Sequence, residues 1–137
     1  MNILHILQQR DRECIAQLVF VVVQDYQHEQ LLLCTSLLPN TIFLVGNALD
    51  ALEAARDMLP DLLLFDTRLS GVVRSSVTHY LCRLCRKHAR ITPLVANIDI
   101  DPWQEMNREA EHLLYCRTPI LLLERLLATT ELEDAFI

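Results

Sequence analysis

Two aspartates follow short apolar runs, and these are the residues of the chain best placed to do chemistry. Asp66 ends the apolar run in PDLLLFDTRLSG and stands before a loop rich in helix- and strand-breaking residues, while Asp25 follows the apolar run 18–23. Each is either a reacting carboxylate or the polar residue that closes a buried strand. Which reading holds depends on whether the fold brings the two side chains together.

The 137-residue chain alternates apolar runs of strand length with helical patterns. Unbroken apolar runs are typical of strands that are covered on both faces of a parallel sheet. We expect five such strands, at 18–23, 41–45, 62–65, 94 to 97 or 98, and 113–116. Proline and N-cap signals bound the expected helices, which are 27–38, 48–59, 72–88, one from Asp101 onward and one from Thr118 to about 128.

Five strand-helix repeats predict an α/β fold: a doubly wound, five-stranded parallel sheet of the flavodoxin-like kind, with strand order 2-1-3-4-5. Residues 18–130 form this domain, after an N-terminal helical extension over 1–17 and before a C-terminal tail over 131–137. In such sheets the functional crevice lies at the carboxyl ends of the strands, where the winding reverses. Asp25 and Asp66 end the two strands that flank this point, so we expect them to lie side by side.

The chain resembles the receiver domains of bacterial response regulators over about 18–129. PDLLLFDTRLSG is similar to the strand of that family that ends in the phosphoacceptor aspartate, which places Asp66 at that position. VVVQDYQHEQ matches the first strand with its acidic pair, NALDALEAARDMLPD the second helix, and YCRTP the aromatic switch position followed by the lysine position. The resemblance implies two-component signal transduction, with a phosphoryl group on Asp66 and Mg²⁺ bound by Asp25 and Asp66.

The sequence departs from the family at three of the five site positions. Gln24 replaces one acid of the pair, and a neutral amide binds a hard cation less strongly than a carboxylate does. Thr118 replaces the lysine, and the fourth strand offers Asn97 or Ile98 where the family has a hydroxyl residue. Phosphoryl transfer to a carboxylate requires fixed positive charge, so the predicted metal site is weak and the chemistry is reduced or lost.

Two arginines offer the missing positive charge. The Arg68 guanidinium lies two residues past Asp66 and is placed to neutralise it directly, and Arg117 is placed to lean in where the lysine is absent. Either side chain would take the place of the cation.

Composition excludes several classes of function. The net charge of −6 argues against direct nucleic-acid binding and against an acidic membrane surface, and no apolar run is long enough to span a bilayer. Five scattered cysteines without a signal-peptide pattern indicate reduced thiols and a cytoplasmic location. The first strand is followed by no glycine-rich phosphate loop, and no nucleophile pair stands at the strand ends, which disfavours an enzyme.

The function that these patterns favour is a receiver-like, phosphorylation-independent module. It would regulate transcription or a bacterial signalling pathway through a protein partner or effector domain, as a homodimer and without a cofactor. Trp103 and Tyr115 are candidates for the partner interface, and the basic third helix is either a solvated face or a docking face for an acidic partner. The alternative is a genuine receiver that is phosphorylated on Asp66 with Mg²⁺.

Overall fold

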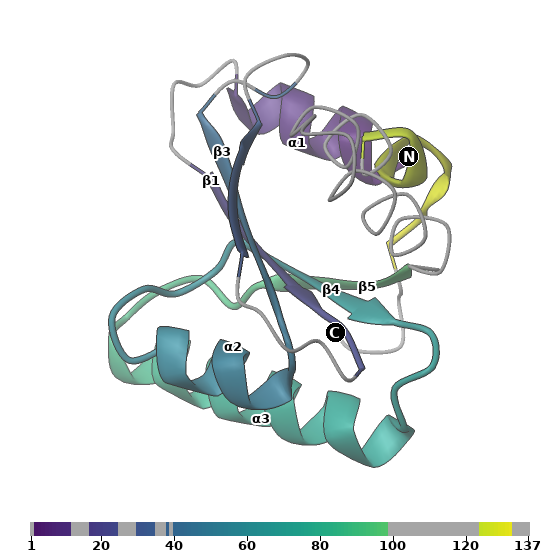
Figure 1. Cartoon of the computed structure of the whole chain (residues 1–137). Helices are drawn as coiled ribbons and strands as arrows, with labels where there is room; N and C mark the ends of the chain where they lie inside the picture. Colours follow the sequence, from purple (N-terminus) through teal and green to yellow (C-terminus); the bar gives the residue numbers. More distant parts are fainter. Residues whose placement is uncertain are drawn as a thin grey trace.

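A central sheet with helices on both of its faces forms the body of the protein. The computed structural model describes residues 2–11, 17–24, 30–34, 38, 40–98 and 124–132. Helix α1 (Ile3–Asp11) and the helical segment 124–129 lie on one face, and α2 (Ala48–Ala54) and α3 (Gly71–Lys87) cover the other (Figure 1). None of the helices in these ranges is long and apolar enough to cross a membrane.

The sheet confirms the predicted order of four parallel strands. The parallel strands are β1 (Gln17–Val22), β3 (Thr41–Gly46), β4 (Leu62–Asp66) and β5 (Leu94–Ile98). They lie in the order β3-β1-β4-β5, with Val22 beside both Gly46 and Phe65. This order places the reversal of winding between β1 and β4, as expected for a doubly wound fold of flavodoxin-like type. The predicted fifth strand, 113–116, lies outside the described residues.

The predicted helix over 27–38 is wrong where the structure describes it. Residues Gln30–Cys34 form β2, which pairs antiparallel with β3 at the edge of the sheet. The run Leu31–Leu33 fits a helix and a strand equally well by its pattern, and a short apolar run is decided by what it can pair with. The unpaired edge of β3 supplies that partner.

Alternation along the strands divides the core into two layers. One layer contains Val19, Val21 and Leu64, and it packs against Ile3 and Leu7 of α1 and against Leu127. The other layer lies under α2 and α3 and consists of Phe20, Val22, Leu44, Ala51, Ala55, Leu63, Phe65, Val77, Leu81 and Val95. Since both faces of the sheet are covered, the parallel strands are mainly apolar on both faces, which explains the runs in the sequence.

The N-terminal helix is joined to the C-terminal part of the chain as well as to the sheet. The Ile3 amide donates to the Thr130 carbonyl oxygen at 2.9 Å, and Asn2 forms a β-bridge with Glu131. The buried Gln17 side chain donates from Nε2 to the Leu7 carbonyl oxygen at 2.8 Å. Helix α1 therefore shares a core with the domain that follows it.

Helix α2 ends earlier than the predicted boundary at residue 59. Its last regular residue is Ala54, and the amides of Arg56 and Asp57 bond three residues back, to Glu53 and Ala54. Such bonds tighten the last turn of a helix. Pro60 also disfavours helical backbone at the residue before it, so the chain leaves the helix before β4.

Candidate functional site

The candidate site lies at the carboxyl end of β4, where Asp66 is the last residue of the strand. Its side chain is fully buried, although an aspartate is rarely buried without a partner. Strand alternation places Asp66 on the same face as Leu62 and Leu64, which is the face covered by α1. A charged carboxylate at this depth requires compensation by hydrogen bonds and positive charge.

Arg68 supplies that compensation. Its Nη2 donates to Asp66 Oδ2 at 2.9 Å, and its Nε donates to Oδ2 at 3.1 Å and more weakly to Oδ1 at 3.4 Å. The backbone amide of Arg68 donates to Oδ1 at 3.1 Å. Both carboxylate oxygens therefore accept hydrogen bonds from one residue. The arginine side chain is 41% exposed, so the ion pair is buried on the acid side and open to solvent on the other.

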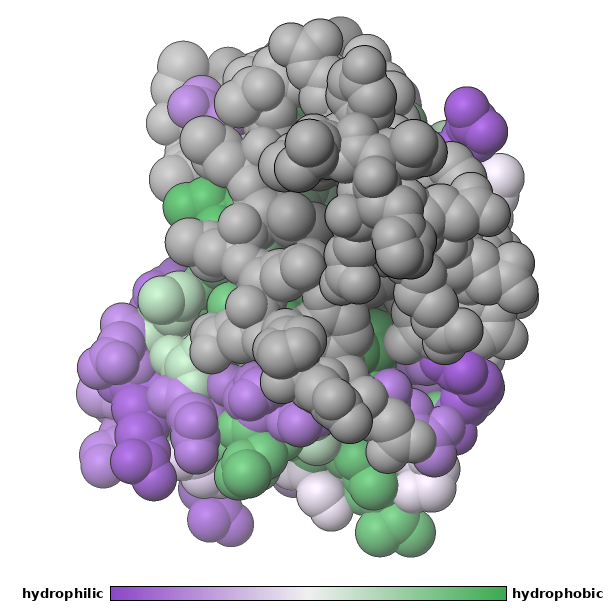
Figure 2. All heavy atoms as spheres, in the orientation of Figure 1, coloured by the Kyte–Doolittle hydropathy of each residue, from purple (hydrophilic) through white to green (hydrophobic). Residues whose placement is uncertain are grey.

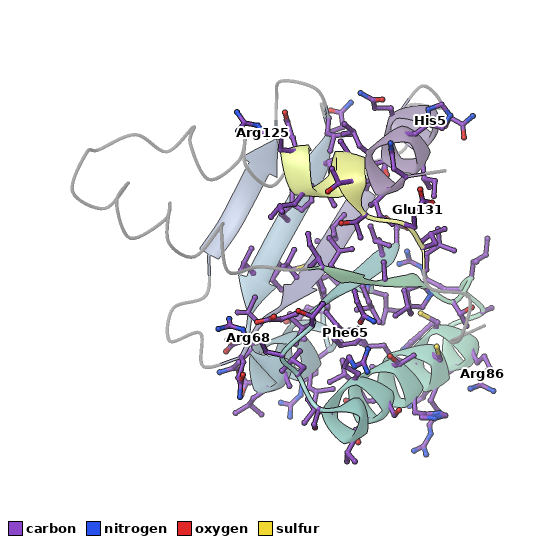
Figure 3. All side chains as sticks on the ribbon, turned by 90° about the vertical axis from the view of Figure 1, so that its right-hand side faces the viewer. His5, Phe65, Arg68, Arg86, Arg125 and Glu131 are labelled. Carbon is purple, nitrogen blue, oxygen red and sulfur yellow. The ribbon has the colours of Figure 1, made fainter. Side chains whose placement is uncertain are left out.

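The loop between β4 and α3 holds this pair by backbone hydrogen bonds. The Leu69 amide donates to the Asp66 carbonyl oxygen at 3.0 Å, and the Thr67 amide donates to Ile98 of β5 at 3.1 Å. Ser70 then caps α3 by accepting from the Val73 amide at 3.2 Å. Figure 3 shows Arg68 at the end of the sheet, close to Phe65 of β4. The turn thus brings Arg68 back over the acid that precedes it by two residues.

The strand register decides which residue of β5 stands beside Asp66. Asp66 pairs with Ile98, whereas Asn97 pairs with Phe65. Of the two candidates for the hydroxyl position, the neighbour of Asp66 is therefore the isoleucine, whose side chain cannot form a hydrogen bond. Asn97 Oδ1 instead accepts from Arg74 Nη1 at 2.8 Å, which ties β5 to the first turns of α3.

Arg74 is a site residue that the sequence placed only among the cations of the basic third helix, which was read as a solvated face or a docking face. It lies on the side of α3 that also carries Val77, Thr78 and Leu81, all of which are buried. A single arginine at helical spacing on an otherwise apolar stripe is the signal that could have marked it. Its guanidinium fixes α3 to the end of β5 next to the candidate site.

The neighbouring turn, between β3 and α2, is closed in a different manner. Asn47 Oδ1 accepts from the Asp50 amide at 2.9 Å, and Asp50 Oδ2 accepts from the Asn47 amide at 2.9 Å. This is a reciprocal capping box. A Cβ on Gly46 would lie 2.7 Å from both Cβ and Oδ2 of Asp50, so only glycine fits beside the box. The Gly46 carbonyl oxygen accepts from the Val23 amide at 2.8 Å, which joins this turn to the end of β1.

Several predicted site residues lie outside the described part of the chain, namely Asp25, Trp103, Tyr115, Arg117 and Thr118. Their roles, including the pairing of Asp25 with Asp66 and the compensating role of Arg117, stay predictions. Gln24, which precedes Asp25, is exposed at the end of β1. Within the described ranges, no group of three or more His, Cys, Asp and Glu side chains is placed to hold a metal ion.

The described thiols are on α3, away from Asp66. Cys85 is buried and Cys82 is half-buried, and neither forms a disulfide. Burial raises the pKa of the Cys82 thiol, an effect that Arg86 partly opposes. Burial, with a smaller contribution from Cys82, likewise raises the pKa of the Cys85 thiol. Both thiols are therefore protonated at neutral pH and are poor metal ligands and nucleophiles.

No protein-family model, curated protein or solved structure matches the chain.

Proposed function

We propose that the chain is a receiver-like signalling module that acts by contact with a protein partner and does not require phosphorylation of Asp66. In this proposal it has no catalytic activity of its own and belongs to a bacterial regulatory pathway, for example one that controls transcription. The proposal includes a fifth parallel strand over 113–116 and a partner face that contains Trp103 and Tyr115.

The observation that carries the proposal is the position of the Arg68 guanidinium. A phosphoacceptor carboxylate needs one oxygen free for attack and one shared with a divalent cation. Here both oxygens of Asp66 accept from Arg68. Arginine has no acceptor atom and stays charged, so it can replace the cation but cannot bind one. The position of the guanidinium therefore supports a site whose positive charge comes from Arg68 and not from a bound cation.

The rest of the described site fits Mg²⁺ poorly. A hard cation of this kind prefers several oxygen ligands, with carboxylates among them. Among the described residues Asp66 supplies the carboxylate at this position. Gln24 has a neutral amide on an exposed side chain, and the side chain of Ile98 has no ligand atom. Mg²⁺ binding at Oδ2 would also have to displace the arginine side chain.

Exposure to Mg²⁺ with acetyl phosphate or beryllofluoride tests the proposal. We expect the wild-type protein to show no mass increase by intact mass spectrometry and no change in ¹⁹F signal on addition of beryllofluoride. The matched controls are Asp66→Asn, which removes the acceptor at nearly constant size, and Arg68→Ala, which frees the carboxylate. Stoichiometric uptake by the wild type that Asp66→Asn abolishes would contradict the proposal and support the alternative, a genuine receiver that uses Asp66 and Mg²⁺.

A further inference from the structure

The outer surface of α2 and α3 carries the exposed apolar side chains of the described structure. Large hydrophobic residues are exposed at five positions in the described ranges: Leu49 (62%), Met58 (42%), Val72 (77%), Tyr80 (38%) and Ile91 (90%). Each belongs to α2, to α3 or to the segment that follows one of them. Figure 2 shows the corresponding green patches among purple residues along the lower part of the molecule, where α2 and α3 lie. Exposed apolar side chains that gather on one layer indicate an interaction surface.

Charge is segregated on the same layer. Residues 67–98 contain six of the twelve Lys and Arg residues of the chain and none of its eighteen Asp and Glu residues. Arg83, Arg86 and Lys87 are exposed on α3 at spacings of three and four, together with Tyr80. Among the described residues, no carboxylate lies within ion-pair distance of these three cations.

Helix α2, beside α3 on the same face of the sheet, has the opposite character. The exposed residues of α2 and of the turn that follows it include Leu49, Glu53, Arg56 and Asp57, which are two acids, one base and one apolar residue. The two helices contact each other through their flanks. The layer therefore presents a stripe with one net negative charge, on α2 and the turn after it, next to a basic helix, with apolar residues on each.

The basic stripe is not explained by the stability of α3 itself. Like charges three or four residues apart destabilise a helix by roughly 0.2–0.5 kcal/mol per pair. The helix dipole favours Arg86 and Lys87 in the last turn, but Arg83 lies a further turn inside the helix. A solvent-facing stripe usually mixes both signs to avoid this repulsion. A surface that retains it is suited to an acidic counterpart.

We propose that this layer is the interface of a homodimer, in which α2 of each copy lies on α3 of the other. A two-fold axis that runs along the groove between the helices, in the plane of contact, produces this arrangement. Such an interface is self-complementary, since the acidic stripe of each copy meets the basic stripe of the other and symmetry makes this contact occur twice. Leu49 and Met58 of one copy then face the side of α3 that carries Val72 and Tyr80 of the other. The inference extends the proposed function, because it identifies a second copy of the chain as a protein partner.

A second copy fits this surface better than nucleic acid does. A duplex carries a negative charge about every 1.7 Å and extends past a single helix. Outside 67–98 the chain holds eighteen acids against six cations, so a long polyanion would be repelled there. A second copy brings a short acidic stripe of matching length and its own apolar side chains.

Sedimentation equilibrium of the full chain, without Mg²⁺ or phosphodonor, tests the interface. We expect a dimer in the micromolar range that weakens as salt is added. A basic-to-acidic variant of α3, Arg83→Glu with Lys87→Glu, is expected to raise the dimer Kd about tenfold or more, because symmetry counts each change twice. The reverse change on α2, Glu53→Lys with Asp57→Lys, is expected to have an effect of the same sign.

Mixing the two variants provides the decisive measurement. One variant is acidic on both helices and the other is basic on both, so the mixture is expected to recover a heterodimer of near wild-type affinity. Arg125→Glu, an exposed change on the opposite face of the sheet (Figure 3), is the matched control and leaves the dimer unchanged. Far-UV circular dichroism verifies that each variant is folded.

Three outcomes would overturn the inference. The first is a wild-type chain that stays monomeric at 100 µM, which is about a hundred times a micromolar Kd. The second is that the charge-reversed variants dimerise as well as the wild type, and the third is that their mixture forms no heterodimer. A monomer that binds poly-glutamate through α3, with loss of binding in the Arg83→Glu, Lys87→Glu variant, would assign the surface to a foreign acidic partner. None of these results bears on phosphate uptake at Asp66, so the proposed function can fail or survive separately.

Discussion

The turn between β3 and α2 and the turn between β4 and α3 both follow a parallel strand and lead into a helix, but an aspartate has a different role in each. In the first, Asp50 lies inside the helix and its carboxylate accepts from the Asn47 amide, so the acid serves the helix end. In the second, Asp66 lies before the loop, is fully buried, and is held by Arg68. An aspartate that caps a helix is explained by local structure alone. A buried aspartate that needs an arginine from its own loop is not, which is why the second turn is the candidate site.

The largest expected effect comes from removing the arginine of the second turn. Arg68→Ala takes the side-chain donors from a buried carboxylate, and breaking such pairs costs several kcal/mol when both partners are buried. Because Arg68 is 41% exposed, water can replace part of its contribution. We expect a loss of about 2 kcal/mol in the free energy of unfolding, measured by urea denaturation followed by circular dichroism.

A double variant separates the ion pair from general damage to the loop. In Arg68→Ala with Asp66→Asn, the buried group is neutral, so the penalty for an uncompensated charge is removed. The double variant is expected to be more stable than Arg68→Ala alone. If it is less stable, the guanidinium supports the loop by packing and not by compensating the charge.

Much of this contrast is encoded locally, and part of it is not. The apolar runs 18–23 and 62–65 predicted two of the parallel strands, because residues covered on both faces must be apolar. The run Leu31–Leu33 was assigned to the wrong element because its pairing partner, β3, lies outside the run and its own pattern does not reveal that contact. Pattern within a segment cannot report a contact outside it.

The same limit applies to the candidate site. Asp66 and Arg68 are two residues apart, so their proximity was predictable as one of two ways to supply charge. The neighbour of Asp66 on β5 depended on a register of one residue between Asn97 and Ile98, which no local pattern fixes. The link from Arg74 to Asn97 depended on how α3 packs against the sheet.

The next largest effect is expected in the first turn, at the glycine beside the capping box. Gly46→Ala places a Cβ 2.7 Å from Cβ and Oδ2 of Asp50, and Asp50 Cβ is part of a helix that cannot move aside freely. We expect a loss of about 1–2 kcal/mol, within the range typical of overpacking, with partial loss of the cap. Asp50→Gly in the Gly46→Ala background is the control, because it removes both the Cβ and the Oδ2 atom that the new Cβ would meet. A fully additive double variant would contradict the steric explanation.

A smaller effect is expected from removing the N-cap of α2. Asn47→Ala removes one half of a reciprocal box, and loss of an N-cap costs about 1 kcal/mol. Asn47→Asp keeps an acceptor at the same position and is the matched control. Urea unfolding should find Asn47→Asp within about 0.5 kcal/mol of the wild type, and an equal loss in both variants would show that the Asn47 amide group has another role.

The smallest expected effect is at Ser70, the N-cap of α3 and the last residue of the turn that holds Asp66. Its hydroxyl oxygen accepts one hydrogen bond, from the Val73 amide at 3.2 Å, and the residue is exposed. Ser70→Ala is therefore expected to cost about 0.5 kcal/mol, at the low end for an N-cap.

Since Arg68 is fixed by its own backbone amide on Asp66 Oδ1 and by the Leu69 bond to the Asp66 carbonyl oxygen, the cap and the ion pair are expected to be independent. The losses in Ser70→Ala and Arg68→Ala should add in the double variant within about 0.5 kcal/mol. A larger coupling would mean that the N-terminus of α3 positions Arg68, and that the two turns differ less than their hydrogen bonds suggest.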